Sequence, residues 1–184
     1  MSQSWSSIRK RLEQDLLCEK LRNRVQYFRT LYHGAPDDYG RFAVRVDGNE
    51  VFWANPYNEI VIDRYMCEVK DSDNIPERGW TEDGEIINDE VNSIAEEQGR
   101  IRAAEDGIID SFLVPHSIRK YLNQSISDSI YDEDPLIRMF AILDRRVGKR
   151  KLIEIAEKYN AQPEWLQQFY KLRFEAEGIS HLYS

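Results

Sequence analysis

The spacing of apolar residues changes along the chain, and each spacing predicts a different secondary structure. Near the N-terminus the apolar positions recur every three to five residues: Trp5, Ile8, Leu12, Leu16 and Leu21. This is the spacing of an amphipathic helix, and the hydroxyl of Ser4 is placed to cap its first turn. We therefore expect an N-terminal amphipathic helix.

From Val25 onward the pattern is typical of strands. Residues 25–32 are rich in aromatic and β-branched side chains, and apolar residues alternate with others over 42–46. Asp47-Gly48 separates that run from the apolar residues 51–53. Such a pair favours a hairpin, because glycine tolerates the positive φ of a type I′ turn.

The next segment predicts the end of the sheet. Asn55-Pro56 closes the preceding strand, and we expect a further strand over 60–65. Residues 25–66 would then form an antiparallel meander. Residues 68–85 are acidic and rich in turn-forming residues, which predicts a loop or linker.

Helical spacing returns in the second half of the chain. One apolar series runs through Ile87, Val91, Ile94, Ile101, Ile108 and Phe112. We expect Pro115 to end it, and a shorter helix to span 118–126. Asp134-Pro135 predicts another helix start, because Asp caps a helix and Pro fits its first turn. That helix should end near Gly148.

Together these elements predict an α+β fold, with an N-terminal helix and a small antiparallel β-meander followed by a mainly helical C-terminal half. The expected regions are a helix-plus-sheet unit over 1–67, an acidic linker over 68–85 and a helical unit over 86–184. The chain has 184 residues, of which 41% are hydrophobic. It is large enough for the two units to share a core as a single domain.

Composition points to a water-soluble, cytoplasmic protein without a membrane segment. Charged residues make up 32% of the chain, and the mean hydropathy is -0.64. Apolar runs fall short of the roughly 18 residues that a membrane span needs, and the polar N-terminus is unlike a secretory signal. The two cysteines, Cys18 and Cys67, are too few for a disulfide framework or a zinc site.

Charge is unevenly distributed in this chain of net charge -8. Residues 71–110 carry thirteen acidic and three basic residues, whereas residues 1–30 carry seven basic and three acidic ones. A basic run occupies 145–151, with five cations: Arg145, Arg146, Lys149, Arg150 and Lys151. Such a cluster needs carboxylates of the same protein or an anionic ligand. The sequence leaves open whether residues 71–110 neutralise it.

The final helices, expected over 150–159 and 163–177, have spacing like a helix-turn-helix. Asn160 could take the left-handed conformation of the tight turn. The second helix would then offer polar side chains to base edges, with the basic run on phosphates. Those side chains are Glu164, Gln167, Gln168 and Lys171. Nucleic-acid binding is an alternative hypothesis but not the favoured one, because the helix is aromatic-rich and the whole chain is acidic.

Enzyme signatures are scarce. The three histidines lack the spacing of metal ligands: His33, His116 and His181. Glu68 and Lys70, with Asp47 or Asp63 upstream, resemble the carboxylate-plus-lysine magnesium site of many nucleases. Chance readily produces such a set in a chain this charged, so a metal-dependent nuclease is a second alternative. We expect neither a cofactor nor, on balance, an enzyme.

Several segments resemble a family of uncharacterised bacterial proteins. They are LIRMFAILDRRVGKRKL at 136–152, PEWLQQFYKLRFEAEG at 163–178, WSSIRKRL at 5–12 and GRFAVRVDG at 40–48. The resemblance implies a bacterial cytoplasmic protein and carries no activity, cofactor or catalytic residue with it.

We therefore expect a small acidic protein that acts by binding a partner protein, in an immunity-like, antitoxin-like or regulatory role. Aromatic residues near the hairpin and linker could anchor such an interface. The candidate interface residues are Trp53, Trp80, Gln167, Gln168 and Lys171, and the basic run is the candidate site for an anion or partner.

Overall fold

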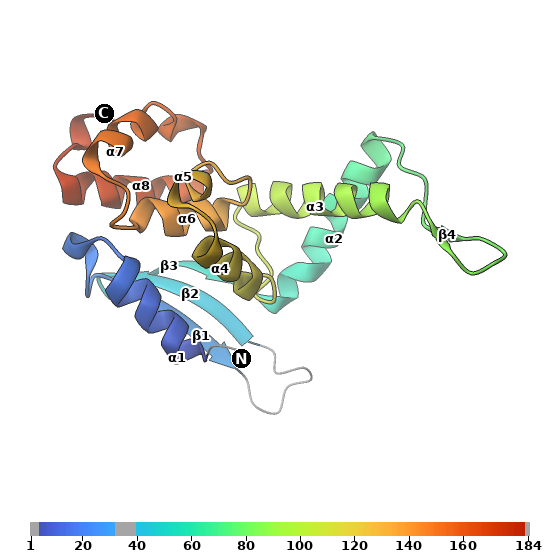
Figure 1. The fold of residues 1–184 in the computed structure, drawn as a ribbon, viewed down its shortest axis with the longest axis horizontal. Helices are drawn as coiled ribbons and strands as arrows, with labels where there is room; N and C mark the ends of the chain where they lie inside the picture. The colour runs from blue at the N-terminus through green and yellow to red at the C-terminus, as the bar shows by residue number, and fades with distance from the viewer. Residues whose placement is uncertain (1–3, 32–39, 183–184) are drawn as a thin grey trace.

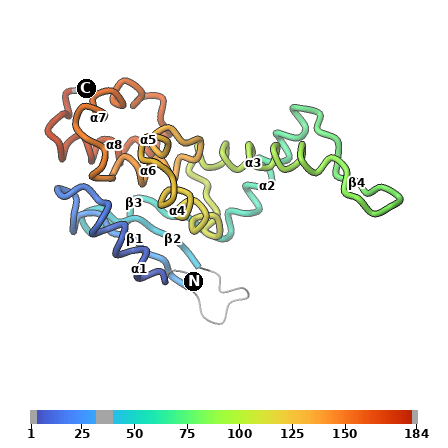
Figure 2. Tube along the Cα trace, viewed as in Figure 1, coloured from blue at the N-terminus to red at the C-terminus, as the bar shows by residue number. Residues whose placement is uncertain are grey.

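The computed structural model describes residues 4–31 and 40–182 of the chain. It shows a body, in which helices cover one small sheet, and a long arm that projects from it (Figure 1). The arm, residues 59–105, comprises two packed helices, α2 and α3, with a short hairpin at its outer end. The fold is α+β, as predicted. The tube in Figure 2 follows the chain out along α2 and back along α3.

The N-terminal helix begins as predicted but ends earlier. α1 (Trp5–Lys10) has Ser4 as its N-cap and continues as a π-helical segment over Arg11–Leu16. The chain then turns extended, because its backbone pairs with the link after α6. Cys18 N donates to Leu143 O at 2.8 Å, and Arg145 N donates to Leu16 O at 2.7 Å. The N-terminal segment is thus fixed to the C-terminal half.

The sheet has three antiparallel strands in the order β1-β2-β3. They are β1 (Val25–Leu31), β2 (Gly40–Val46) and β3 (Asn49–Ala54). The predicted hairpin is confirmed, since Asp47 and Gly48 both have positive φ, 51° and 85°. One face of the sheet presents Tyr27, Phe42 and Phe52 to the core.

The predicted fourth strand over 60–65 is wrong, because these residues belong to α2 (Glu59–Ser72). A short 3-10 turn, Pro56–Asn58, precedes α2, and Asn55 caps that turn through Tyr57 N. β-branched residues at 60–62 suit a strand locally. The buried residues of α2, however, are Ile62 and Val69. They are seven residues apart and therefore lie on one face of a helix.

The predicted linker over 68–85 is also partly structured. Its first residues complete α2, and a two-stranded hairpin follows, with β4 (Gly79–Trp80) paired to β5 (Ile86–Ile87). α3 (Asp89–Glu105) then returns against α2. The two helices approach closely at Gly99, where a Cβ would lie 2.6 Å from Met66 Cα. The absence of a side chain at Gly99 therefore allows the helices to approach this closely.

The body is completed by five helices: α4 (Val114–Asn123), α5 (Ile126–Ser129), α6 (Pro135–Leu143), α7 (Lys149–Ala156) and α8 (Glu164–Glu177). Pro115 lies in the first turn of α4 instead of ending the preceding helix. The predicted cap is confirmed, because Asp134 Oδ1 accepts Leu136 N at 2.8 Å. α6 ends at Leu143, five residues before Gly148.

α6 forms the centre of the core. Arg138 is its one residue that is not buried. Phe140 contacts aromatic rings of the sheet and of α4, at 5.5 Å from Tyr27 and 5.4 Å from Tyr121 between centroids. The body therefore encloses a large aromatic core, which fixes both the sheet and the root of the arm.

Candidate functional site

The basic run is divided by its contacts with the protein. Arg146 donates to Asp144 Oδ2 from Nε at 2.9 Å and from Nη2 at 2.6 Å. Asp144 is 1% exposed and also accepts the Tyr121 hydroxyl at 2.5 Å. Hydrogen bonding to Asp144 raises the pKa of Arg146, and burial raises the pKa of Tyr121. Arg173 completes the network, with 2.8 Å bonds to the carbonyls of Asp144 and Val147.

The other cations of the run do not join Arg146 in one site. Lys151 pairs with Glu154 at 2.7 Å, and Lys149 Nζ reaches Glu177 O at 3.4 Å. Arg145 and Arg150 are exposed. The ion pairs found for the run within 4–31 and 40–182 are with Asp144 and Glu154, so neighbouring carboxylates, and not those of residues 71–110, partner these cations.

The second helix of the expected helix-turn-helix is largely buried in the body. α8 buries Leu166, Phe169, Tyr170, Leu172, Arg173 and Phe174. Gln168 donates to Val51 O and Trp165 O, and Gln167 donates to Gln162 O. Lys171 is exposed and lies over the Tyr159 ring at 5.9 Å. Asn160 lies in a 3-10 turn, not in a left-handed position. The side-chain amides of both glutamines therefore donate hydrogen bonds within the protein.

The nuclease-like set is not assembled either. Glu68 and Lys70 lie on α2 and not after a strand, and Lys70 pairs with Glu96 at 2.7 Å. Asp47 pairs with Arg24 in the hairpin turn. Across the described ranges, no group of three or more His, Cys, Asp or Glu side chains could hold a metal ion. Of the histidines, His33 lies outside the described residues.

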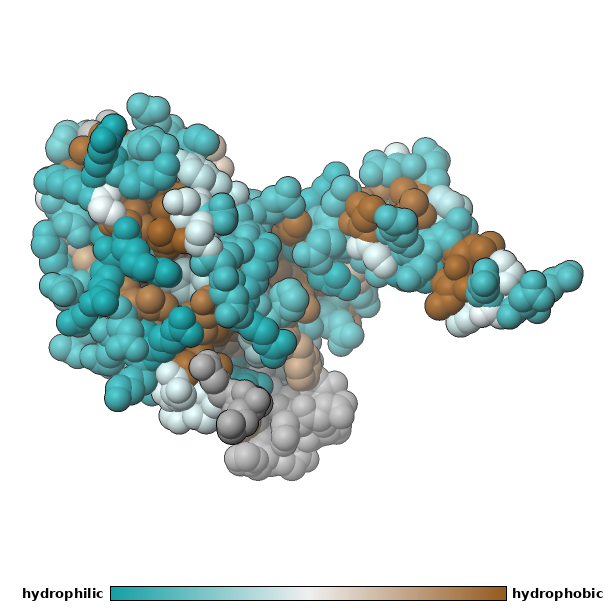
Figure 3. Space-filling view, viewed as in Figure 1, coloured by the Kyte–Doolittle hydropathy of each residue, from teal (hydrophilic) through white to brown (hydrophobic). Residues whose placement is uncertain are grey.

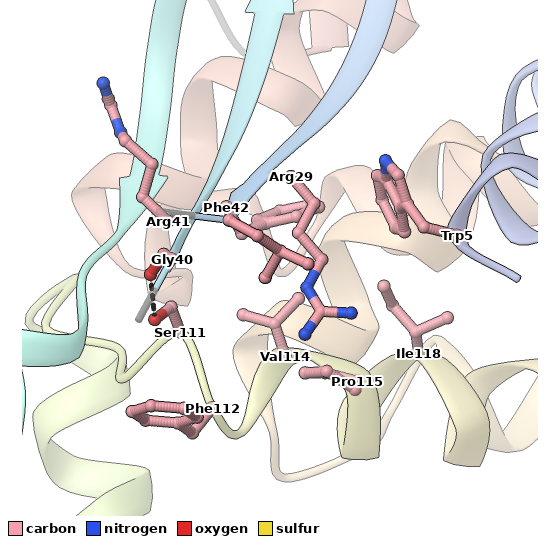
Figure 4. A pocket seen from close by; sticks show the side chains of 11 residues that line it. Trp5, Arg29, Gly40, Arg41, Phe42, Ser111, Phe112, Val114, Pro115 and Ile118 are labelled. Carbon is pink, nitrogen blue, oxygen red and sulfur yellow. Dashed lines mark hydrogen bonds between the residues drawn. The ribbon is translucent and has the colours of Figure 1, made fainter. Parts of the chain in front are cut away.

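A small pocket lies between the sheet and α4, but it is too narrow for a ligand. Figure 4 shows Arg29 extending over Val114 and Pro115, while Ser111 Oγ donates to Gly40 O at 2.7 Å. Its volume of about 30 Å³ is close to that of one water molecule. We assign it no binding role.

The arm carries the most unusual surface of the described chain. Large apolar side chains there are exposed, and we call the set the arm patch: Trp80 (70%), Ile86 (50%), Ile87 (43%), Val91 (40%) and Ile94 (53%). Figure 3 shows apolar surface on the outer half of the arm, set among polar residues. Large exposed apolar patches with polar rims are typical of interaction sites.

The face through which α3 packs is not the face that carries the arm patch. α3 buries Asn92, Ala95, Gly99, Ala103 and Ala104, whose spacing follows one side of the helix. Val91 and Ile94 lie on a different side and stay exposed. The sequence predicts a helix here from its apolar residues, yet those residues are not the ones that hold it to the protein.

Polar contacts stiffen the outer end of the arm. Arg78 binds Asp89 at 2.7 Å and Glu96 at 2.5 Å. Hydrogen bonding from Arg78, followed by Lys70, lowers the pKa of Glu96 to about 2. Buried Asn92 donates to the carbonyls of Pro76 and Asn88, both at 2.8 Å. The hairpin is therefore tied to α3.

The root of the arm is fixed to the body. Asn58 Nδ2 donates to Ile109 O at 2.9 Å, and Trp165 Nε1 donates to Ala104 O at 2.9 Å. Glu105, the last residue of α3, pairs with Arg138 of α6 at 2.7 Å. The arm is thus anchored on two sides and presents its patch at a distance from the core.

The candidate interface residues from the sequence fall in different places. Trp80 lies on the arm, and Trp53 is 54% exposed on the sheet. Gln167, Gln168 and Lys171 lie on α8, so the structure does not gather the five into one surface. The sequence did not single out Ile87, Val91 and Ile94 as candidate interface residues, because their helical spacing indicated a core. The small residues Ala95, Gly99 and Ala103 were the signal for the alternative face.

Comparisons place the chain in a family without assigning an activity. Among the described residues, no helix combines the length and apolar character needed to cross a membrane. No curated protein and no solved structure matches the chain. A family model matches residues 4–174, which is most of the chain, and this confirms the family resemblance expected from the sequence. The protein belongs to the SF0329 protein family.

Proposed function

We propose that this protein acts by binding a partner protein through the arm patch. The observation that carries the proposal is the exposure of five large apolar residues on the outer part of the arm, where α3 packs through small residues instead. Exposed apolar side chains at helical spacing are the usual anchors when a helix docks into a groove. An immunity-like, antitoxin-like or regulatory role fits such a surface.

The negative charge of the arm favours a partner with a basic surface. Residues 59–105 contain fourteen acidic and five basic residues, a net of -9, whereas the rest of the chain has nineteen acidic and twenty basic residues, a net of +1. A partner with a cationic rim around an apolar groove complements this surface. Nucleic acids and anionic membranes would be repelled by it.

A second copy of the chain fits the arm less well than a different protein does. Two arms packed face to face would bring two strongly acidic surfaces together. An arm docked on the basic run of another copy would be a head-to-tail contact, which builds open chains unless its rotation closes a ring. We therefore commit to a different, basic partner.

A photo-crosslinking residue at position 94 tests the proposal in the protein's own cells. Ile153 is the matched control, because it is 47% exposed but lies on α7 of the body. We expect one discrete basic protein to crosslink at 94 and not at 153. The purified partner should bind the chain less tightly as salt rises, and Ile94→Asp should weaken binding at least tenfold while Ile153→Asp leaves it unchanged.

Two results would overturn the proposal. Equal crosslinking at both positions would show nonspecific apolar contact, and a crosslinked product consisting of two copies of this chain would identify self-association instead.

A further inference from the structure

We propose that a cavity at the root of the arm binds a small organic cation with an apolar body, such as an alkyl or aryl amine. This goes beyond the proposed function, because the cavity lies away from the arm patch and its occupant is a small molecule. The cavity lies where α2 and α3 meet α4 and the N-terminal cap of α6, and its volume is about 330 Å³. Ligand sites of small molecules begin at about that size.

Half of the twelve residues that line the cavity are aliphatic. They come from α2, α3 and the connection to α4, and include Ile62, Ile101, Ala104, Ile108 and Leu113. Such walls accept the apolar body of a ligand and exclude water from its polar end. A strongly hydrated inorganic ion would gain nothing from them.

Asp110 provides the polar end. It is 8% exposed and lines the cavity. One carboxylate oxygen, Oδ1, accepts Phe112 N at 2.9 Å, whereas no hydrogen bond from residues 4–31 or 40–182 reaches the other. Because that second oxygen is not fully enclosed by protein atoms, a ligand in the cavity can reach it. The ammonium group of a ligand would supply both the donor and the opposite charge.

The remaining polar groups favour a cation over an anion. Asp134 also lines the cavity, and its oxygens accept Ser117 Oγ at 2.6 Å and Leu136 N at 2.8 Å. Glu97 and Arg100 offset one another at the wall, 3.1 Å apart. With His116 included, carboxylates outnumber basic side chains in the lining by three to two, and Asp110 is the acceptor still available. Burial raises the pKa of both Asp110 and Asp134.

A set of three matched probes tests the charge requirement on the full chain: 2-phenylethylamine, the neutral 2-phenylethanol and the anionic phenylacetate. Binding is followed by amide chemical shifts of the nitrogen-15-labelled protein at pH 7. We expect saturable shifts over residues 104–117 with the amine, with a Kd of about 1 mM for so small a ligand. The alcohol and the anion should bind at least tenfold more weakly.

Asp110→Asn removes the charge but keeps an oxygen for Phe112 N, so the loop geometry is retained. We expect it to raise the Kd of the amine at least tenfold. Asp63→Asn, at an exposed carboxylate of α2 outside the lining, is the matched control and should leave the Kd unchanged. Non-saturable shifts, equal binding of the alcohol, or equal effects of the two variants would overturn the proposal.

The probe series on the unaltered protein decides the question even if Asp110→Asn folds poorly. Crosslinking at position 94 reports on the arm patch separately, so failure of one proposal is distinguishable from failure of the other.

Discussion

The body of this protein and helix α3 of its arm bury different kinds of side chain. In the body, Phe140 meets Tyr27 and Tyr121 inside a continuous aromatic and aliphatic core. In the arm, α2 and α3 touch through Gly99 and small neighbours, while Val91 and Ile94 face outward. The difference teaches that large apolar residues are enclosed in the body, whereas on the outer part of the arm several of them stay exposed to solvent.

The largest expected effect is in the body. Phe140→Ala removes a ring that joins the sheet to α4, and large-to-small changes of this kind cost about 3–5 kcal/mol. Urea unfolding followed by circular dichroism should show this loss across the whole molecule. A change below about 1 kcal/mol would mean that the core is not organised around α6.

The second-largest loss in the free energy of unfolding is expected in the buried polar network of the body. Arg173→Met leaves the carbonyls of Asp144 and Val147 without their donor, at a cost of about 2–4 kcal/mol. Arg150→Met, at an exposed cation, should change the free energy of unfolding by less than about 0.5 kcal/mol. Similar values for the two variants in the same urea experiment would contradict the network.

An intermediate and local effect is expected at the contact between the arm helices. Gly99→Ala places a methyl group against the Met66 backbone and should destabilise the arm by about 1–3 kcal/mol. Hydrogen exchange should accelerate in α2 and α3 but not in α6. Gly148→Ala is the control, because nothing lies within 4 Å of a Cβ there, and it should leave exchange unchanged.

Acid should loosen the arm before the body. The pKa of Glu96 is lowered to about 2 in the fold from an ordinary 4.5, so its contribution is complete above pH 4.5 and is lost as pH falls from there toward 2. Amides of the arm should exchange about two to five times faster at pH 3 than at pH 6, after correction for intrinsic rates. Glu96→Gln should abolish this difference, whereas Glu97→Gln should keep it.

The smallest effect is expected at the arm patch itself. Ile94→Asp should change the free energy of unfolding by no more than about 0.5 kcal/mol, because the side chain is already 53% exposed. Ile62→Asp, at a buried position of α2, should be far more destabilising. Comparable losses for the two would show that the arm patch is structural and would remove the basis of the proposed interface.

Features set by a few adjacent residues could be predicted from the sequence. The Asp47-Gly48 turn and the Asp134 cap are examples, because their geometry depends on local backbone conformation. α2 was mistaken for a strand at 60–65, since its helical state depends on packing of Ile62 and Val69 against a later segment. Local preference is overridden there by tertiary contact.

The candidate sites depend on arrangements that no local pattern specifies. Helical spacing at Val91 and Ile94 reveals an apolar face but not whether protein or water meets it. Asp110 lies between Ile109 and Ser111 in the sequence, and its burial beside a cavity follows from where α4 meets the root of the arm. The basic run looked like a single site, yet Arg146 turns back to Asp144, whereas Lys149, Arg150 and Lys151 belong to α7.

The attachment of the N-terminal segment to α8 constrains the order of folding. Cys18 Sγ and Lys20 Nζ both reach the carboxylate of Glu177, at 3.3 and 2.9 Å, across 159 and 157 residues of chain. During synthesis the first helix therefore emerges long before its final neighbours exist. Contacts of such long sequence separation form late. The N-terminal segment can complete these contacts only after α8 has been synthesised, and a chain that stops before α8 would lack the helix that packs against Glu19–Leu21.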